Sequence, residues 1–296
     1  MADVSERGQM LLVAGLTLAT AFVALALVLN TAIYTENLST RTSDPGASEA
    51  IRFAEAVEVD LGDAVTYVNE REATYPDRRA AFEDVVASWS DATADSAAID
   101  GVFTAVSLSS VEQGTRVVDG NASDGLTNAT GAGDWTVVAD GRVRAFEMRV
   151  DPPTGRSLVV EFANASATWT TTVERVDSST VEVRTTHPDA TVATCTVAAS
   201  GGATIDVSRE TVAGDGDPRY CRALDYASEI RGAYDLELRD ADAVSGTFEL
   251  VANRAVDDGP STETVLYGAT VSATYDSGRV TARWADLRIA PGEVGR

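Results

Sequence analysis

The sequence predicts an α+β fold: a long N-terminal transmembrane helix, a short helical segment, and then a mainly antiparallel β domain built as a sandwich or rolled meander. Two observations predict it. Residues 8–35 contain no charged side chain, and the spacing of apolar residues changes from helical to alternating after Gly101. The predicted organisation is a signal-like leader (1–8), a transmembrane helix and stalk (9–41), a helical segment (42–100) and an external β-rich domain (101–296).

The uncharged stretch is long and apolar enough to cross a membrane. Between Met10 and Leu29 it contains seven Leu, three Val and Phe22, and on an insertion scale these side chains favour insertion by roughly 5 kcal/mol. One helix over the whole stretch would be about 40 Å long, more than the roughly 30 Å of a bilayer's hydrocarbon core. The alternative is a secretory signal cleaved after Ala24-Leu25-Ala26, which would release the chain.

Two amphipathic helices are predicted in the helical segment. Asp44 and Pro45 form a typical helix start. Apolar residues then recur at spacings of three and four over about 46–72, with acidic residues between them. A second helix begins near Pro76 and fades within 91–98. We expect both helices to pack on the domain's own sheet; a stalk or a partner surface is the alternative.

Beyond Gly101 the sequence is typical of many short antiparallel strands. Segments rich in Val, Thr and aromatic residues are bounded by Gly, Asp, Asn or Pro. The predicted strands cover 102–110, 135–139, 142–150, 157–163, 167–175, 180–186, 191–198, 203–208, 233–239, 246–253, 264–275 and 279–288. A tight hairpin turn is expected at 276–278 and one helix at 220–232. The close spacing of the strands favours a sandwich or rolled meander.

The charge balance is strongly acidic. The 296 residues include 46 Asp and Glu, 23 Arg and no Lys, which gives a net charge of −23. The repulsion among so many negative charges destabilises a folded chain. At 1 M salt, however, the Debye length is only about 3 Å, so most of this repulsion is screened. Because 44% of the residues are hydrophobic, we infer a folded halophilic protein rather than a disordered acidic tail. The negative field argues against nucleic acid as a partner.

The cysteines and the sequons favour an exported domain. Cys195 and Cys221 are the only cysteines, and in an oxidising compartment such a pair more often forms a disulfide than a metal site. The bridge would close a loop of about 25 residues and contribute roughly 3 kcal/mol. Four Asn-X-Ser/Thr sequences are candidate glycosylation sites. They lie at Asn37, Asn121, Asn128 and Asn164.

No catalytic motif is recognisable. The sequence lacks a nucleophile elbow, a zinc-protease helix, a phosphate-binding loop and the dinucleotide-binding glycine pattern. His187, the single His, precedes Pro188 and is interpreted as a turn residue rather than a general base. The acidic triplets at 215–217 and 240–242 could offer oxygen ligands to Ca²⁺ or Mg²⁺, but neither completes an EF-hand loop. We therefore expect no enzyme activity, no metal and no cofactor.

The residues before the apolar stretch resemble a known processing signal. Arg7-Gly8-Gln9, followed at once by that stretch, is similar to the signal of type IV pilin-like (pseudopilin-like) proteins, and the pattern of residues 7–41 resembles uncharacterised haloarchaeal pilin-like surface proteins. The resemblance implies cleavage between Gly8 and Gln9 by a dedicated peptidase, which leaves the apolar helix on the mature protein. Val13 stands where many bacterial pilins carry Glu, and this difference favours a minor, accessory subunit.

Two functional hypotheses follow. The first is a pilin-like subunit or minor accessory component of an archaeal cell-surface filament or secretion-type assembly, which contacts other pilin-like subunits through its N-terminal helix. The second is a monomeric membrane-anchored ectodomain that binds an envelope component. Both predict a single-pass protein of the cell membrane with an extracellular C-terminal domain, because Arg7 precedes the apolar stretch and the cysteines follow it.

Overall fold

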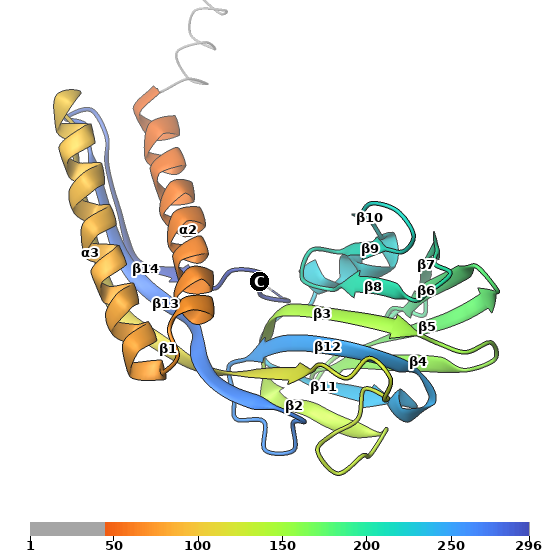
Figure 1. Ribbon diagram of the computed structural model, residues 1–296. Coiled ribbons are helices and arrows are strands. Elements are labelled where there is room, and N and C mark those ends of the chain that lie inside the picture. Colours follow the sequence, from red (N-terminus) through yellow and green to blue (C-terminus); the bar gives the residue numbers. More distant parts are fainter. Residues whose placement is uncertain (1–44, 296) are drawn as a thin grey trace, which may run out of the picture.

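The computed structural model describes residues 45–295 of the chain (Figure 1). The predicted leader, the predicted transmembrane helix and stalk at 9–41, the processing residues Arg7, Gly8 and Gln9, and the sequon at Asn37 all lie outside the described residues. Within residues 45–295 the chain forms two antiparallel sheets, with two α-helices on the larger one.

The predicted fold class is wrong. The described residues form mostly antiparallel β sheet, and none of the helices among residues 45–295 is long and apolar enough to cross a membrane. Helices α2 (Pro45–Arg71) and α3 (Tyr75–Ile99) have 27 and 25 residues, so they are not a short segment either. Charged side chains separate their apolar residues along both helices, and each helix therefore buries one face and leaves the other in water.

Both helices lie on one end of the larger sheet, so the expected packing on the domain's own sheet is confirmed (Figure 1). Thr74 caps the start of helix α3, because its hydroxyl accepts a hydrogen bond from the backbone N–H of Asp77 (3.4 Å). The ring of Phe53 on α2 lies 6.1 Å from Trp89 on α3 and 5.9 Å from Tyr275 on the sheet. The other buried apolar side chains of α2 are Ala50, Ala54, Val57, Leu61, Ala64, Val65 and Val68.

The larger sheet has eight strands. Their spatial order is β10 (Arg219–Tyr220), β9 (Thr211–Ala213), β8 (Ala203–Asp206), β3 (Val143–Asp151), β12 (Ser245–Ala252), β1 (Phe103–Asp119), β13 (Thr262–Asp276) and β14 (Thr281–Ile289). The smaller sheet has six strands, in the order β2 (Trp135–Gly141), β11 (Tyr234–Arg239), β4 (Ser157–Ala163), β5 (Thr168–Asp177), β6 (Thr180–Thr186) and β7 (Val192–Ala198). Two short 3₁₀ helices, η1 (Arg222–Ser228) and η2 (Ala241–Ala243), complete the described elements.

Strands β1 and β13 are long and connect two parts of the molecule (Figure 1). One end of this pair carries α2, α3 and β14, and we call this part the helical lobe. The other end pairs with β12 and joins the part that we call the sandwich. The pairing shifts register at Leu108 and again at Glu112, where β-bulges bend the strands. At Gly114 a side chain would collide with the Ala252 carbonyl oxygen, at 2.6 Å from the Cβ position.

In the sandwich, the two sheets enclose one apolar core. The ring of Phe162 on β4 is at its centre, 6.3 Å from Phe146 on the larger sheet, 5.3 Å from Tyr234 on β11 and 5.5 Å from Tyr226 on η1. Alternate residues of the facing strands are buried, as in the pattern of β3. This alternation is why the two-residue period of the sequence predicted the strands.

The C-terminal residues fasten the helical lobe to the sandwich. The backbone N–H of Val294 donates to the carbonyl of Val143 (2.9 Å), at the start of β3. From the other side, the Asn69 side chain on α2 makes two hydrogen bonds to the backbone of Leu266 on β13, at 2.8 and 2.9 Å. Helix α2 is therefore held on the strand that continues into the sandwich.

Candidate functional site

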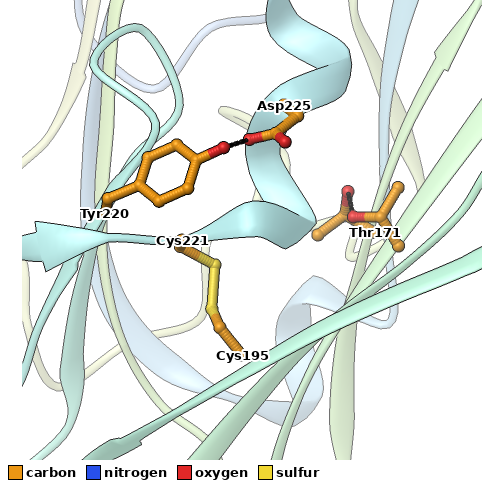
Figure 2. Close-up of a disulfide and its surroundings, with 6 residues drawn as sticks. Thr171, Cys195, Tyr220, Cys221 and Asp225 are labelled. Atoms are coloured by element: carbon orange, nitrogen blue, oxygen red, sulfur yellow. Dashed lines mark hydrogen bonds between the residues drawn. A yellow bond between two sulfur atoms is a disulfide. The ribbon is translucent and has the colours of Figure 1, made fainter.

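A disulfide bond joins Cys195 on β7 to Cys221, the residue before η1 (Figure 2). The two Cα atoms are 5.7 Å apart, so the pair predicted from the sequence is present. Cys221 is completely buried. The bond links η1 covalently to the last strand of the smaller sheet.

The 3₁₀ helix η1 covers the inner face of strands β5 to β7. Its residue Tyr226 is buried against Phe162. On the neighbouring strands β5 and β6, Thr171 and Thr185 form a hydrogen bond of 2.8 Å between their hydroxyls (Figure 2). The predicted helix at 220–232 is a shorter 3₁₀ helix, which begins directly after the disulfide-bonded Cys221 and ends at Ser228. The disulfide and η1 together close this edge of the sandwich.

A cleft of about 390 Å³ opens between η1 and the turn that joins β6 to β7. We call it the disulfide cleft. Its side chains include Trp169, His187, Val192, Arg222, Asp225 and Glu229.

The polar groups of the disulfide cleft are partly paired with one another. The imidazole Nδ1 of His187 is 3.4 Å from a carboxylate oxygen of Glu229. The Tyr220 hydroxyl, at the rim, donates to the carboxylate of Asp225 (Figure 2), and this hydrogen bond raises the pKa of the tyrosine. The buried indole N–H of Trp169 has no hydrogen-bond partner among residues 45–295. The cleft therefore combines carboxylates, a guanidinium and an imidazole, which together can hold a polar ligand.

His187 lies in a turn, as the sequence predicted. Its backbone N–H donates to the carbonyl of Thr191 (2.9 Å), and its carbonyl accepts from Ala190 (2.9 Å). In the same turn the hydroxyl of Thr191 donates to Asp189 at 2.6 Å, and this bond is the main reason that the pKa of Asp189 is lowered. The sequence did not show that this turn would face η1 and line a cleft.

The acidic triplets at 215–217 and 240–242 lie in turns, where their residues form hydrogen bonds with neighbouring loops. The Asp215 carboxylate accepts hydrogen bonds from the backbone and the hydroxyl of Ser200 (3.1 and 3.0 Å). Asp240 adopts a left-handed conformation with a φ of 54°, and its N–H donates to Asp134 (2.8 Å). Within residues 45–295, no group of three or more His, Cys, Asp or Glu side chains is arranged to hold a metal ion.

The three described sequons lie on loops between strands. In each, the side-chain oxygen of the asparagine accepts a hydrogen bond from the backbone N–H two residues later. These asparagines are Asn121, Asn128 and Asn164. Their glycosylation stays a prediction.

A second feature lies at the far end of the helical lobe, where α2 begins, α3 ends and a turn joins β13 to β14 (Figure 1). We call this end the proximal pole. It contains a pocket of about 600 Å³ in which the Tyr275 hydroxyl donates to the carboxylate of Glu49 at 3.0 Å. Ile99 and Phe103 are exposed beside the chain reversal at this pole, with 86% and 61% of their surface accessible.

No protein-family model, curated protein or solved structure matches the chain. The features described above therefore rest on this chain's own geometry.

Sequence reasoning singled out neither the disulfide cleft nor the exposed pair at the proximal pole. The cleft brings together side chains that are up to 60 positions apart, such as Trp169 and Glu229, and no local pattern marks them.

Proposed function

We propose that the chain is a non-enzymatic, pilin-like subunit or minor accessory component of a haloarchaeal cell-surface assembly. In this proposal the apolar stretch at 8–35 attaches the protein to the cell membrane, and residues 45–295 stand outside the cell. The motivation from the sequence is the Arg7-Gly8-Gln9 signal followed at once by that stretch.

The single observation that carries the proposal is the position of Pro45. The described part of the chain begins at the proximal pole, the end of the helical lobe that points away from the sandwich (Figure 1). Only nine residues separate Thr35, the last of the uncharged stretch, from Pro45, and nine residues span at most about 30 Å. A body attached at this end holds its sandwich away from the membrane.

The connection between the lobe and the sandwich suits such a role. Glu293, whose side chain is only 1% exposed, pairs with Arg142 (3.2 Å), which precedes β3, and with Arg288 (3.1 Å) on β14. Together with the Asn69 contacts to β13, this pairing joins the helical lobe to the sandwich, which supports a role in holding the sandwich at a set distance from the membrane. The net charge of −23 fits a surface exposed to molar salt, where the repulsion is screened.

Mass spectrometry of the N-terminus of the native protein tests this proposal. A chain that begins at Gln9 is the expected result, because the resemblance implies cleavage after Gly8. A chain that begins at Leu27 would have lost most of the apolar stretch and would contradict membrane attachment. A chain that begins at Met1 or Ala2 and stays in the membrane would contradict the pilin-type processing but not the attachment.

The second candidate function is a monomeric anchored ectodomain that binds an envelope component. The disulfide cleft favours it, since its polar side chains come from η1 and from the β6–β7 turn, and both elements belong to the sandwich, away from the proximal pole (Figure 1). Exchange of Glu229 for Gln, with the same exchange at the half-buried Glu237 on the outer face of β11 as the control, would separate the two functions. Loss of cell-surface ligand binding in the first variant alone would favour the ectodomain.

A further inference from the structure

Two of the large apolar side chains that the described residues expose to water lie close together at the proximal pole. Ile99 is the last residue of α3 and Phe103 is the first of β1. Between them the chain turns back at Gly101, with a φ of +70°, so the two side chains flank one tight reversal. Ile99 is the most exposed large apolar side chain among residues 45–295.

Folding of the helical lobe does not need either side chain to be apolar. The next positions along β1, Thr104 and Val106, face the helices and are buried, while Phe103 lies on the alternate side of the strand. Isolated exposed apolar residues are common on protein surfaces. What distinguishes this pair is its place, at the end of the body where the described chain begins (Figure 1).

We propose that Ile99 and Phe103 insert into the outer surface of the lipid bilayer that holds the chain. This inference rests on the membrane attachment proposed above. Because nine residues separate Pro45 from Thr35, the proximal pole stays within about 30 Å of the end of the uncharged stretch. Apolar side chains within that reach gain by leaving water for the lipid interface.

The charge of the proximal pole predicts when the contact forms. Glu49, Asp95, Asp100 and Asp276 carry negative charge there, and Arg279, in the turn between β13 and β14, is positive. These acidic groups resist close approach to an anionic bilayer at low salt. At molar salt the repulsion acts over only about 3 Å, whereas apolar burial is not screened. The contact should therefore strengthen as salt is raised.

Site-specific fluorescence in vesicles tests the contact. The full chain, with its disulfide intact, would carry a single Cys in place of Ile99 or Phe103, labelled with a fluorophore. It would be reconstituted at molar salt into vesicles of phosphatidylcholine and phosphatidylglycerol, with a quencher attached to the lipid headgroups. Matched controls place the Cys at Val192 or Tyr220, which are 54% and 61% exposed on the sandwich.

The expected result is quenching several-fold stronger at positions 99 and 103 than at positions 192 and 220. A chain that fails to float with the vesicles would overturn the membrane attachment itself. A chain that floats but shows equal quenching at all four positions would overturn this inference and leave the attachment standing. Self-quenching between labelled copies, without quenching by lipid, would identify a second copy as the occupant and also overturn it.

Discussion

The carboxylate of Glu293 holds the junction between the helical lobe and the sandwich. It accepts hydrogen bonds from Arg142 Nη1 (3.2 Å) and from Arg288 Nη2 and Nε (3.1 and 3.2 Å). Arg144, nine-tenths buried nearby, has its pKa lowered to about 10 by burial, and Glu293 acts against that shift. Exchange of Glu293 for Gln keeps the shape of the side chain and removes a negative charge that acts on all three guanidinium groups.

The structure sets the size of the effect. Breaking a buried ion pair by removing one partner costs about 3–5 kcal/mol, because the other charge stays buried. Here Arg288 keeps Glu112 as a partner at 3.0 Å, and the Arg142 side chain is 32% exposed, so water can solvate part of it. We therefore expect E293Q to lower the free energy of unfolding by about 2–3 kcal/mol, somewhat less than the full range for a buried pair.

Urea unfolding of the full chain in detergent micelles at molar salt, followed by tryptophan fluorescence, measures this loss. The control is E237Q, since Glu237 also pairs with an arginine, Arg239, at 2.9 Å, but on an exposed strand face. Such surface pairs contribute less than about 1 kcal/mol. A loss in E293Q no larger than that in E237Q would refute the view that this carboxylate fastens the two parts together.

Three further predictions concern the same fold. Reduction of the disulfide, or its removal in a C195S/C221S variant, should lower the free energy of unfolding by about 3.5 kcal/mol, the value that the loop-entropy model gives for a separation of 26 residues. Urea unfolding with and without reductant measures this loss, and an unchanged midpoint would contradict it. Burial raises the pKa of three tyrosines above the ordinary value of about 10. The stability that the neutral tyrosines contribute is therefore fully present below about pH 10. Above that pH the free energy of unfolding falls by about 1.4 kcal/mol per tyrosine for each pH unit. These tyrosines are Tyr226, Tyr234 and Tyr267. Burial lowers the pKa of Arg144, so between about pH 10 and 12.5 this residue makes the free energy of unfolding rise with pH. Together the four groups should lower the free energy of unfolding by about 3 kcal/mol per pH unit. A free energy of unfolding that stays constant from about pH 10 to 11 would contradict the burial of the three tyrosines. Finally, F53A should lower the free energy of unfolding by about 3–5 kcal/mol because it removes the contacts of Phe53 with three other aromatic rings, those of Trp89, Tyr275 and Trp284. I51A, at a 58% exposed position of the same helix, should lower it by less than about 0.5 kcal/mol; equal melting temperatures of the two variants would argue against the packing of α2.

Local patterns predicted the positions of many elements. The helix predicted at 46–72 corresponds to α2, and the strand predicted at 180–186 is β6. The turn predicted at 276–278 lies between β13 and β14, where Gly278 has a φ of +72°. These features depend on the spacing of apolar residues and on turn residues, which a single sequence displays directly.

Long-range arrangement could not be read in the same way. Strand β1 runs on to Asp119, beyond the predicted end at residue 110, because its polar middle is held by pairing with β13 rather than by an apolar pattern, and its last residues, from Thr115, pair with β12. Helix α3 does not fade at 91–98 but continues to Ile99, and the apolar side chains that pack it on the sheet lie earlier in the helix, up to Trp89. Strands β9 and β10 are too short to give a pattern.

The sequence did not predict the ion pairs of Glu293 at the junction between the helical lobe and the sandwich either. Glu293 resembles a surface residue of an acidic tail, and only the fold brings it to Arg142, 151 positions earlier. The predicted transmembrane helix was inferred from composition over residues outside the described range, so the fold class built on it did not match residues 45–295.

Crosslinking within the apolar stretch tests the proposed subunit role most directly. Single cysteines placed in turn at positions from Leu11 to Leu29 would be oxidised in native membranes kept at molar salt, where the disulfide at Cys195 and Cys221 leaves no other free thiol in the chain. An assembled subunit predicts crosslinks between this stretch and neighbouring pilin-like chains at a recurring subset of positions, and none from a cysteine placed at Val192 on the sandwich. Absence of crosslinks at every position of the stretch would contradict the account and leave a monomeric anchored ectodomain.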